Sequence, residues 1–284
     1  MTKPTSSGRL GVRLGYRFNL MGLSALSIIL LWGGVALFAP HIIPHSVGEI
    51  VDTDYFGPMS RDLWFGSDYL GRDIFSRILI GARYTLGISL AAVSIACFSG
   101  VALGMTAAVA GGWFDTALSR LLDALNSIPS KLFGLVVVAA VGSSIPALIA
   151  TLSVIYTPGA YRFARALAVN VNTMDFMVVA RIRGEGLPYL ISSEILPNIL
   201  GPVLADLGLR FVFIVLLLSG LSFLGLGVQP PYADWGALVR ENIGGVPFGA
   251  PAVIFPSLAI ASLTISVNLL IDNLPSRIRD RSAE

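Results

Sequence analysis

Hydrophobic residues run along this chain in six long stretches. A helix needs about 20 apolar residues to cross the hydrocarbon core of a bilayer, and the six stretches, each long enough or nearly so, cover residues 20–38, 86–110, 117–141, 145–163, 199–227 and 252–271. They predict an all-α, polytopic membrane protein with six transmembrane helices and a membrane domain over residues 20–272.

The third and fifth stretches hold pairs of charged residues, which are costly at membrane depth and usually face the bundle interior or a wet cavity. Arg120 and Asp123 are three apart, and Asp206 and Arg210 are four apart, so each pair shares a helix face and is expected to form an ion pair. These pairs either line a transport path or subunit interface, or lock helix packing. The polar candidates at this depth are Arg120, Asp123, Asn126, Lys131, Asp206 and Arg210.

The positions of Lys and Arg predict the orientation. These residues concentrate in the tail 1–19, in the loop 166–197 with the preceding Arg165, and in the tail 273–284. Six crossings place all three segments on one side, and positive residues mark that side as cytoplasmic. The loop 40–83 is then outside, and its acidic residues offset its arginines.

Composition supports a membrane protein and excludes several other classes. The 284 residues are 55% hydrophobic and only 13% charged, whereas about a quarter of the residues in soluble domains are charged. The net charge of +2 is too small to indicate nucleic-acid binding, and the single Cys97 excludes an intrachain disulfide. The first stretch follows Arg9, Arg13 and Arg17 but is longer than a signal-peptide core, so we expect a retained helix.

The chain has no predicted catalytic or nucleotide site. It lacks a Gly-x-x-x-x-Gly-Lys-Ser/Thr phosphate loop, and neither Lys3 nor Lys131 follows a glycine. We find no nucleophile–base pair and no carboxylate dyad. His41 and His45 lie in the outer loop without a carboxylate at ligand spacing, so they do not favour a metal site. Any ATPase or ligand-capturing domain must therefore be a separate chain.

The cytoplasmic loop predicts an elbow of two short helices. Asp175 can cap a helix over 176–183. Gly184 and Gly186 then interrupt it, because glycine adopts positive φ at little cost. A second helix over 187–195 is expected to end at Pro197, which leads into the fifth stretch.

This loop resembles the conserved cytoplasmic loop of binding-protein-dependent ABC importers. Matching positions are Ala180, Gly184, Ile195, Leu196, Pro197 and Asn198. Val178 and Val179 stand where that family has Glu and Ala, and Glu185 is a candidate replacement for the missing charge. The resemblance implies that contact with an ATPase involves Ala180, Arg181, Gly184, Glu185, Gly186, Leu187, Ile195 and Pro197.

Two further segments, 65–83 and 222–236, resemble signatures of the second permease subunit of dipeptide, oligopeptide and nickel importers. The signature residues are Gly66, Asp68, Gly71, Arg72, Asp73, Ser76, Arg77, Arg83, Trp235 and Gly236. Apolar residues on one face of 71–83 predict an amphipathic helix on the outer membrane surface. This helix either docks a binding protein or packs under the loop between the fifth and sixth stretches.

The resemblance implies a type I ABC importer permease fold with cytoplasmic coupling helices in a bacterial inner membrane. It implies a second permease, two ATPase subunits and a periplasmic or lipid-anchored binding protein as partners, with ATP and Mg on the ATPases and no cofactor on this chain. The cargo is a di- or oligopeptide, or alternatively a nickel or other metal chelate, an opine or glutathione. A self-sufficient secondary transporter is a less favoured alternative, because no internal repeat is evident.

Overall fold

A computed structural model describes residues 20–273, and all regular structure in that range is helical apart from two isolated β-bridges. The predicted tail 1–19 lies outside the described residues, as does the predicted tail 273–284 apart from Asn273. The elements are α1 (Leu20–Ile42), α2 (Ile74–Ala110), α3 (Gly112–Asn126), α4 (Ser130–Val141), α5 (Ile145–Asn172), α6 (Asp175–Ile182), α7 (Leu187–Tyr189), the π-helix η1 (Leu190–Ile195), α8 (Leu196–Phe223), α9 (Trp235–Asn242), the 3₁₀-helix η2 (Ile243–Phe248) and α10 (Pro251–Asp272).

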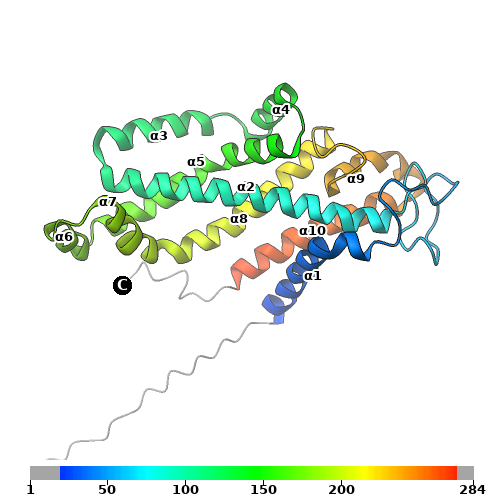
Figure 1. Ribbon diagram of the computed structural model, residues 1–284, viewed down its shortest axis with the longest axis horizontal. Coiled ribbons are helices and arrows are strands. Elements are labelled where there is room, and N and C mark those ends of the chain that lie inside the picture. Colours follow the sequence, from blue (N-terminus) through cyan, green and yellow to red (C-terminus); the bar gives the residue numbers. More distant parts are fainter. Residues whose placement is uncertain (1–19, 274–284) are drawn as a thin grey trace, which may run out of the picture.

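The longest helices, α2, α5 and α8, run side by side along the long axis of the molecule (Figure 1). The short helices α6 and α7 lie at one end of this bundle, and the segment 43–73 lies at the other. α1 packs against α10 and α2, and the indole Nε1 of Trp32 donates a hydrogen bond of 2.9 Å to Ser262 Oγ. The all-helical prediction is confirmed.

Within residues 20–273, four helical runs are long and apolar enough to cross a bilayer: α1, α2, the continuous run Leu187–Phe223 and α10. The pair α3 and α4 makes a fifth if a bent pair counts as one span. At 28 residues α5 is also long enough, but tyrosine, proline and arginine side chains make it less apolar. Four to five spans are therefore supported, and the count of six stays a prediction.

The predicted surface helix over 71–83 is wrong. Residues 74–83 form the first turns of α2, which continues without a break to Ala110. Asp73 caps this helix by accepting hydrogen bonds from the backbone nitrogens of Phe75 and Ser76, which satisfies two donors that the first helical turn leaves free. Ile74 and even Arg77 are buried, so the segment lies inside the bundle. The alternative, packing beneath the loop between the fifth and sixth stretches, is confirmed by the contacts of Trp235 described below.

The third apolar stretch is not one straight helix. α3 ends at Asn126 and α4 begins at Ser130, and their axes differ by 83°. Pro129 explains the break, because a proline has no backbone N–H and disfavours helical geometry in the residue before it. Sequence periodicity alone does not reveal so large a bend.

The close packing of α2 on α5 depends on small residues, among them Gly100, Gly104 and Ala108. A Cβ atom added at Gly100 would lie 2.6 Å from the Cβ of Ala160. At the same interface the amide of Asn172 donates a 3.0 Å hydrogen bond to the carbonyl oxygen of Ala108. The two helices run in the same direction. They end at the same level, since α5 continues to Asn172, nine residues beyond the predicted limit of 163.

Candidate functional site

The predicted elbow is present at the end of the bundle where α5 and α8 meet (Figure 1). α6 ends at Ile182, and Gly184 then takes a φ of +81°, a conformation that costs a non-glycine residue about 1–2 kcal/mol. The backbone nitrogen of Gly184 donates to the carbonyl oxygen of Arg181, and that of Glu185 donates to Ala180. These two hydrogen bonds close the turn and reverse the chain.

Three details of the predicted elbow are wrong. Met174 stands at the cap position and Asp175 is the first helical residue, with no side-chain capping bond. Gly186 has a φ of −83°, an extended conformation open to other residues. Pro197 does not end the second helix, because η1 leads directly into α8 and Pro197 lies in the first turn of α8. The wider π-helical turn before it accommodates a residue that has no N–H to donate.

One face of α6 anchors the elbow to the bundle. Met177 and Ala180 are fully buried in a cluster that also contains Leu190 and Ile195. The guanidinium of Arg181 donates a 2.6 Å hydrogen bond to the side chain of Asn172 at the end of α5. The elbow is therefore held by both long helices that it connects.

The opposite face of the elbow is apolar and exposed. Ile182 is 80% exposed, and Val178 and Val179 are each 53% exposed. Ile182, Val178 and Val179 were not predicted as contact residues. Among those that were, Arg181, Gly184, Gly186, Leu187 and Pro197 are exposed, Glu185 is half-buried, and Ala180 and Ile195 face inward. The sequence prediction thus mixed anchoring residues with surface residues, because spacing alone does not say which face of a short helix is covered.

The charged residues at membrane depth pair differently from the prediction. Asp206 and Arg210 do pair, with 2.5 Å between Asp206 Oδ2 and Arg210 Nε. Asp123, however, pairs with Arg162 of α5 at 2.6 Å rather than with Arg120. Sequence analysis missed Arg162 because its partner is 39 residues away.

A second ion pair between α3 and α5 was also missed. Asp115 accepts two hydrogen bonds of 2.5 Å from Arg165, and Ser119 bonds the hydroxyl of Tyr161 at 2.7 Å. Together with Asp123 and Arg162, these contacts fix α3 along α5. Asn126 and Lys131 lie exposed on either side of the break between α3 and α4.

Four charged residues form a buried cluster at the end of the bundle opposite the elbow. Asp68 accepts from Arg72 Nε and Arg77 Nη1, each at 2.7 Å. Glu241 of α9 accepts from the same two arginines at 3.0 and 2.8 Å. Burial lowers the pKa of Arg72, but the adjacent charges of Asp68 and Glu241 outweigh burial and raise it above the usual range. The cluster joins the segment 43–73 to α2 and α9.

Trp235 and Gly236 fasten the start of α9 to α2 and α8. The buried indole Nε1 of Trp235 donates a 3.0 Å hydrogen bond to the carbonyl oxygen of Ile78. A Cβ atom at Gly236 would lie 2.5 Å from the carbonyl oxygen of Ser219, so only glycine allows this approach. The signature residues Trp235 and Gly236 therefore build one packed corner. The signature glycines Gly66 and Gly71 lie in the loop before α2, where they have φ values of +74° and +76°.

Asp234 is the main residue of this corner that sequence analysis missed. It is fully buried and accepts hydrogen bonds from Ser222 Oγ and from the backbone nitrogens of Val228, Gly236 and Ala237. Burial raises its pKa, and these donors oppose the rise. Asp234 stands just before the helical run of α9, a position typical of an N-cap residue. This position was the sequence signal that could have identified it.

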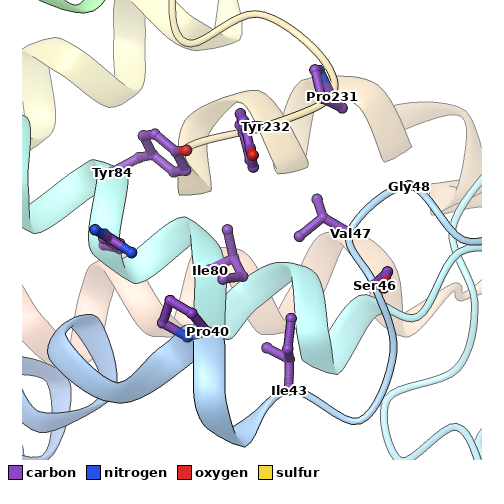
Figure 2. Close-up of a pocket in the computed structure, with 10 residues that line it drawn as sticks. Pro40, Ile43, Ser46, Val47, Gly48, Ile80, Tyr84, Pro231 and Tyr232 are labelled. Atoms are coloured by element: carbon purple, nitrogen blue, oxygen red, sulfur yellow. The ribbon is translucent and has the colours of Figure 1, made fainter.

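A cavity of about 390 Å³ lies beside this corner, between the end of α1, α2 and the loop before α9. Figure 2 shows Tyr84 and Tyr232 next to one another at this cavity, and their ring centroids are 5.2 Å apart. The signature residue Arg83 also lines it. Nearby, His45 Nδ1 lies 3.3 Å from Asp73 Oδ2, and within residues 20–273 no three His, Cys, Asp or Glu side chains group to hold a metal ion.

Comparison with known proteins identifies the family. Residues 100–280 match the family described as binding-protein-dependent transport system inner membrane component. The chain is 31% identical over 256 residues to a dipeptide transport system permease of Alkalihalophilus pseudofirmus, covering 90% of this chain and 84% of the relative. It is 34% identical over 265 residues to a glutathione transport system permease of Escherichia coli and to a putative peptide transport system permease of Brucella abortus, covering 91% of this chain and 86% of each relative.

A solved structure supports the same fold. The crystal structure of an amino acid ABC transporter with histidines matches with a TM-score of 0.50 and 16% identity, covering 70% of this chain and 91% of the other. Several apolar helices and the family description make this a multi-pass inner membrane protein. The chain belongs to the family of binding-protein-dependent transport system inner membrane components and is a permease subunit of an ABC importer of the peptide-transport group.

Proposed function

We propose that this chain is the second permease subunit of an importer for dipeptides, oligopeptides or a related small solute such as glutathione. Relatives named for dipeptide, glutathione and peptide transport support this range of cargo. A permease of a nickel or other metal-chelate importer is the alternative cargo assignment. His41 at the end of α1 and His45 in the segment 43–73 give it little support, because His45 contacts a single carboxylate.

In this proposal the chain crosses the membrane six times with both termini in the cytoplasm. α3 and α4 together form the third span and α5 the fourth. The elbow then lies on the cytoplasmic side, which agrees with Arg181 and Arg183 at its surface and with the rule that positive loops stay inside. The corner built by Trp235 and the buried charge cluster lies on the outer side.

The elbow carries the coupling role in this proposal. Its inner face is buried against α8, its outer face is apolar and exposed, and α7 continues through η1 into α8 without a break. Force applied by an ATPase to the exposed face of α6 therefore reaches a helix that spans the bilayer, because the buried face of α6 packs on the start of the continuous run Leu187–Phe223. This continuity is the single observation on which the coupling role depends.

The remaining parts of the importer belong to other chains. A second permease completes the path, two ATPase subunits bind ATP and Mg, and a periplasmic or lipid-anchored binding protein delivers the solute at the outer corner. Members of this family are transport subunits rather than enzymes, and we propose that this chain performs no catalytic step of its own. No cofactor is assigned to it.

Reconstitution in proteoliposomes tests the proposal. Vesicles that contain both permeases, both ATPases and the binding protein should accumulate a radiolabelled dipeptide only when ATP is present on the elbow side. Vesicles that lack the ATPases should take up none, even with a proton or sodium gradient imposed. Gradient-driven uptake without ATPases would identify a secondary transporter and overturn the proposal.

A further inference from the structure

A strip of charged side chains crosses the surface of α3, α5 and α8 at the depth of the membrane. Its central pair joins Asp123 to Arg162, and these side chains are 52% and 49% exposed although they are hydrogen-bonded to each other. One turn along α5, the guanidinium of Arg210 packs on Gly159. Figure 1 shows α3 lying along α5, which brings these residues to one region of the bundle.

The strip lies within the hydrocarbon layer, on the elbow side of its middle. Arg162 is ten residues from the end of α5 at Asn172, which is about 15 Å at 1.5 Å per residue. α2 ends at the same level, since Asn172 bonds the carbonyl oxygen of Ala108. α5 has 28 residues and is about 42 Å long, which exceeds the hydrocarbon core of about 30 Å, so the pair lies in the half of the core nearer the elbow.

Lipid does not suit this surface, because an ionised side chain that faces acyl chains within the hydrocarbon layer is costly. Half of each side chain in the Asp123–Arg162 pair is open after pairing. The pair therefore faces either water or another protein subunit in the assembled importer. The interior of the strip also holds Asp206 and Arg210, which are 17% and 14% exposed.

Basic residues outnumber acidic residues in this region. Asp123 and Arg162 balance each other, as do Asp206 and Arg210. Arg120 is left over: it is exposed, it lies three residues from Asp123 on the same helix face, and it forms no ion pair with any residue in 20–273. Lys131, exposed in the first turn of α4, adds a second unbalanced cation.

We propose that this strip lines the aqueous transport path and that its surplus positive charge makes the importer favour acidic solutes over basic ones. The inference rests on the proposed function and extends it to the charge class of the cargo. Basic side chains lining a narrow pore select for anions, and charges act over longer distances near low-dielectric walls than in bulk water. The preferred cargo is then a peptide with an additional carboxylate.

Competitive uptake through the complete importer tests this inference. The probes are the tripeptides Ala-Glu-Ala, Ala-Gln-Ala and Ala-Lys-Ala, each supplied at a concentration that saturates the binding protein. The quantity measured is the ratio of Glu-peptide to Lys-peptide uptake. Dividing the ratio of a variant by the ratio of the wild type removes the selectivity of the binding protein, which is the same in both.

The key variant is Arg120→Gln, with Arg120→Lys as its charge-preserving control. We expect Arg120→Gln to lower the ratio by about threefold or more, as expected for removing one charge close to the solute, and Arg120→Lys to keep it within experimental error. Uptake of the neutral peptide should change little in both. Arg120 makes no ion pair in the described chain, so neither variant is expected to unfold the protein.

Three results would overturn the inference. The first is an unchanged uptake ratio in Arg120→Gln, and the second is an equal fall of this ratio in Arg120→Lys. The third is loss of co-purification of the second permease with Arg120→Gln, which would assign the strip to a subunit interface. Wild-type vesicles that take up none of the tripeptides with ATP would instead contradict the proposed function, so the two failures are distinguishable.

Discussion

Glycine sets the distance between α2 and α5, so one added methyl group at Gly104 should force these helices apart. A Cβ atom at Gly104 would lie 2.7 Å from the carbonyl oxygen of Tyr161 and 2.8 Å from the backbone nitrogen of Arg165. Ordinary contacts between such atoms are about 3.5 Å or longer. The helices must therefore separate by about 0.7–1 Å, because backbone atoms cannot rotate away.

Overpacking of this kind costs about 1–3 kcal/mol. Alanine also gains up to about 1 kcal/mol over glycine inside a helix. Gly87→Ala isolates that gain, because a Cβ atom at Gly87 on the same helix meets no atom within 4 Å. We therefore expect Gly104→Ala to be about 1–3 kcal/mol less stable than Gly87→Ala.

A difference of this size lowers the apparent Tm by on the order of 5 °C. Thermal unfolding of the two purified variants in the same detergent, followed by fluorescence-detected size exclusion, measures it. Double substitution at Gly100 and Gly104 should enlarge the difference, since both glycines face the same helix. Equal Tm values for Gly104→Ala and Gly87→Ala would refute the close approach of α2 and α5.

Three further predictions address the elbow and the outer corner. Gly184→Ala should reduce uptake per ATP hydrolysed, because φ of +81° strains alanine by about 1–2 kcal/mol. Gly186→Ala, at φ of −83°, should keep the wild-type value. Equal uptake per ATP hydrolysed in the two variants would contradict this. Arg77→Met should lower the free energy of unfolding by about 3 kcal/mol, whereas Arg61→Met on the surface should not, as measured by thermal unfolding. Trp235→Phe should cost about 1 kcal/mol through the lost indole hydrogen bond; an unchanged Tm would contradict that bond.

The parts of the fold that sequence analysis predicted correctly depend on local patterns. Apolar length alone located α1, α8 and α10 to within a few residues at most boundaries. The elbow followed from Gly184, where positive φ is needed. Each of these signals lies within a few residues of the feature that it predicts.

The parts that were wrong depend on contacts between distant residues. Asp123 binds Arg162 rather than its near neighbour Arg120 because α3 lies along α5, and no local pattern encodes that packing. The surface helix over 71–83 was wrong because its charged residue Arg77 is neutralised by Glu241, 164 residues later. The apolar residues on one face of 71–83 predicted a surface helix because they carry no sign of this distant partner.

Cross-linking at the elbow tests the central claim most directly, namely that this segment meets an ATPase subunit in the cytoplasm. The variant Ile182→Cys, made in a chain whose buried Cys97 is replaced by alanine, carries a single thiol at an 80% exposed position. A matched control places the thiol at Met59, 58% exposed in the segment at the opposite end of the bundle. We predict that a short thiol-to-amine cross-linker joins Ile182→Cys, but not Met59→Cys, to an ATPase subunit in the assembled importer. The account would be contradicted if Ile182→Cys formed no such cross-link, or if a membrane-impermeant reagent added outside intact cells labelled it.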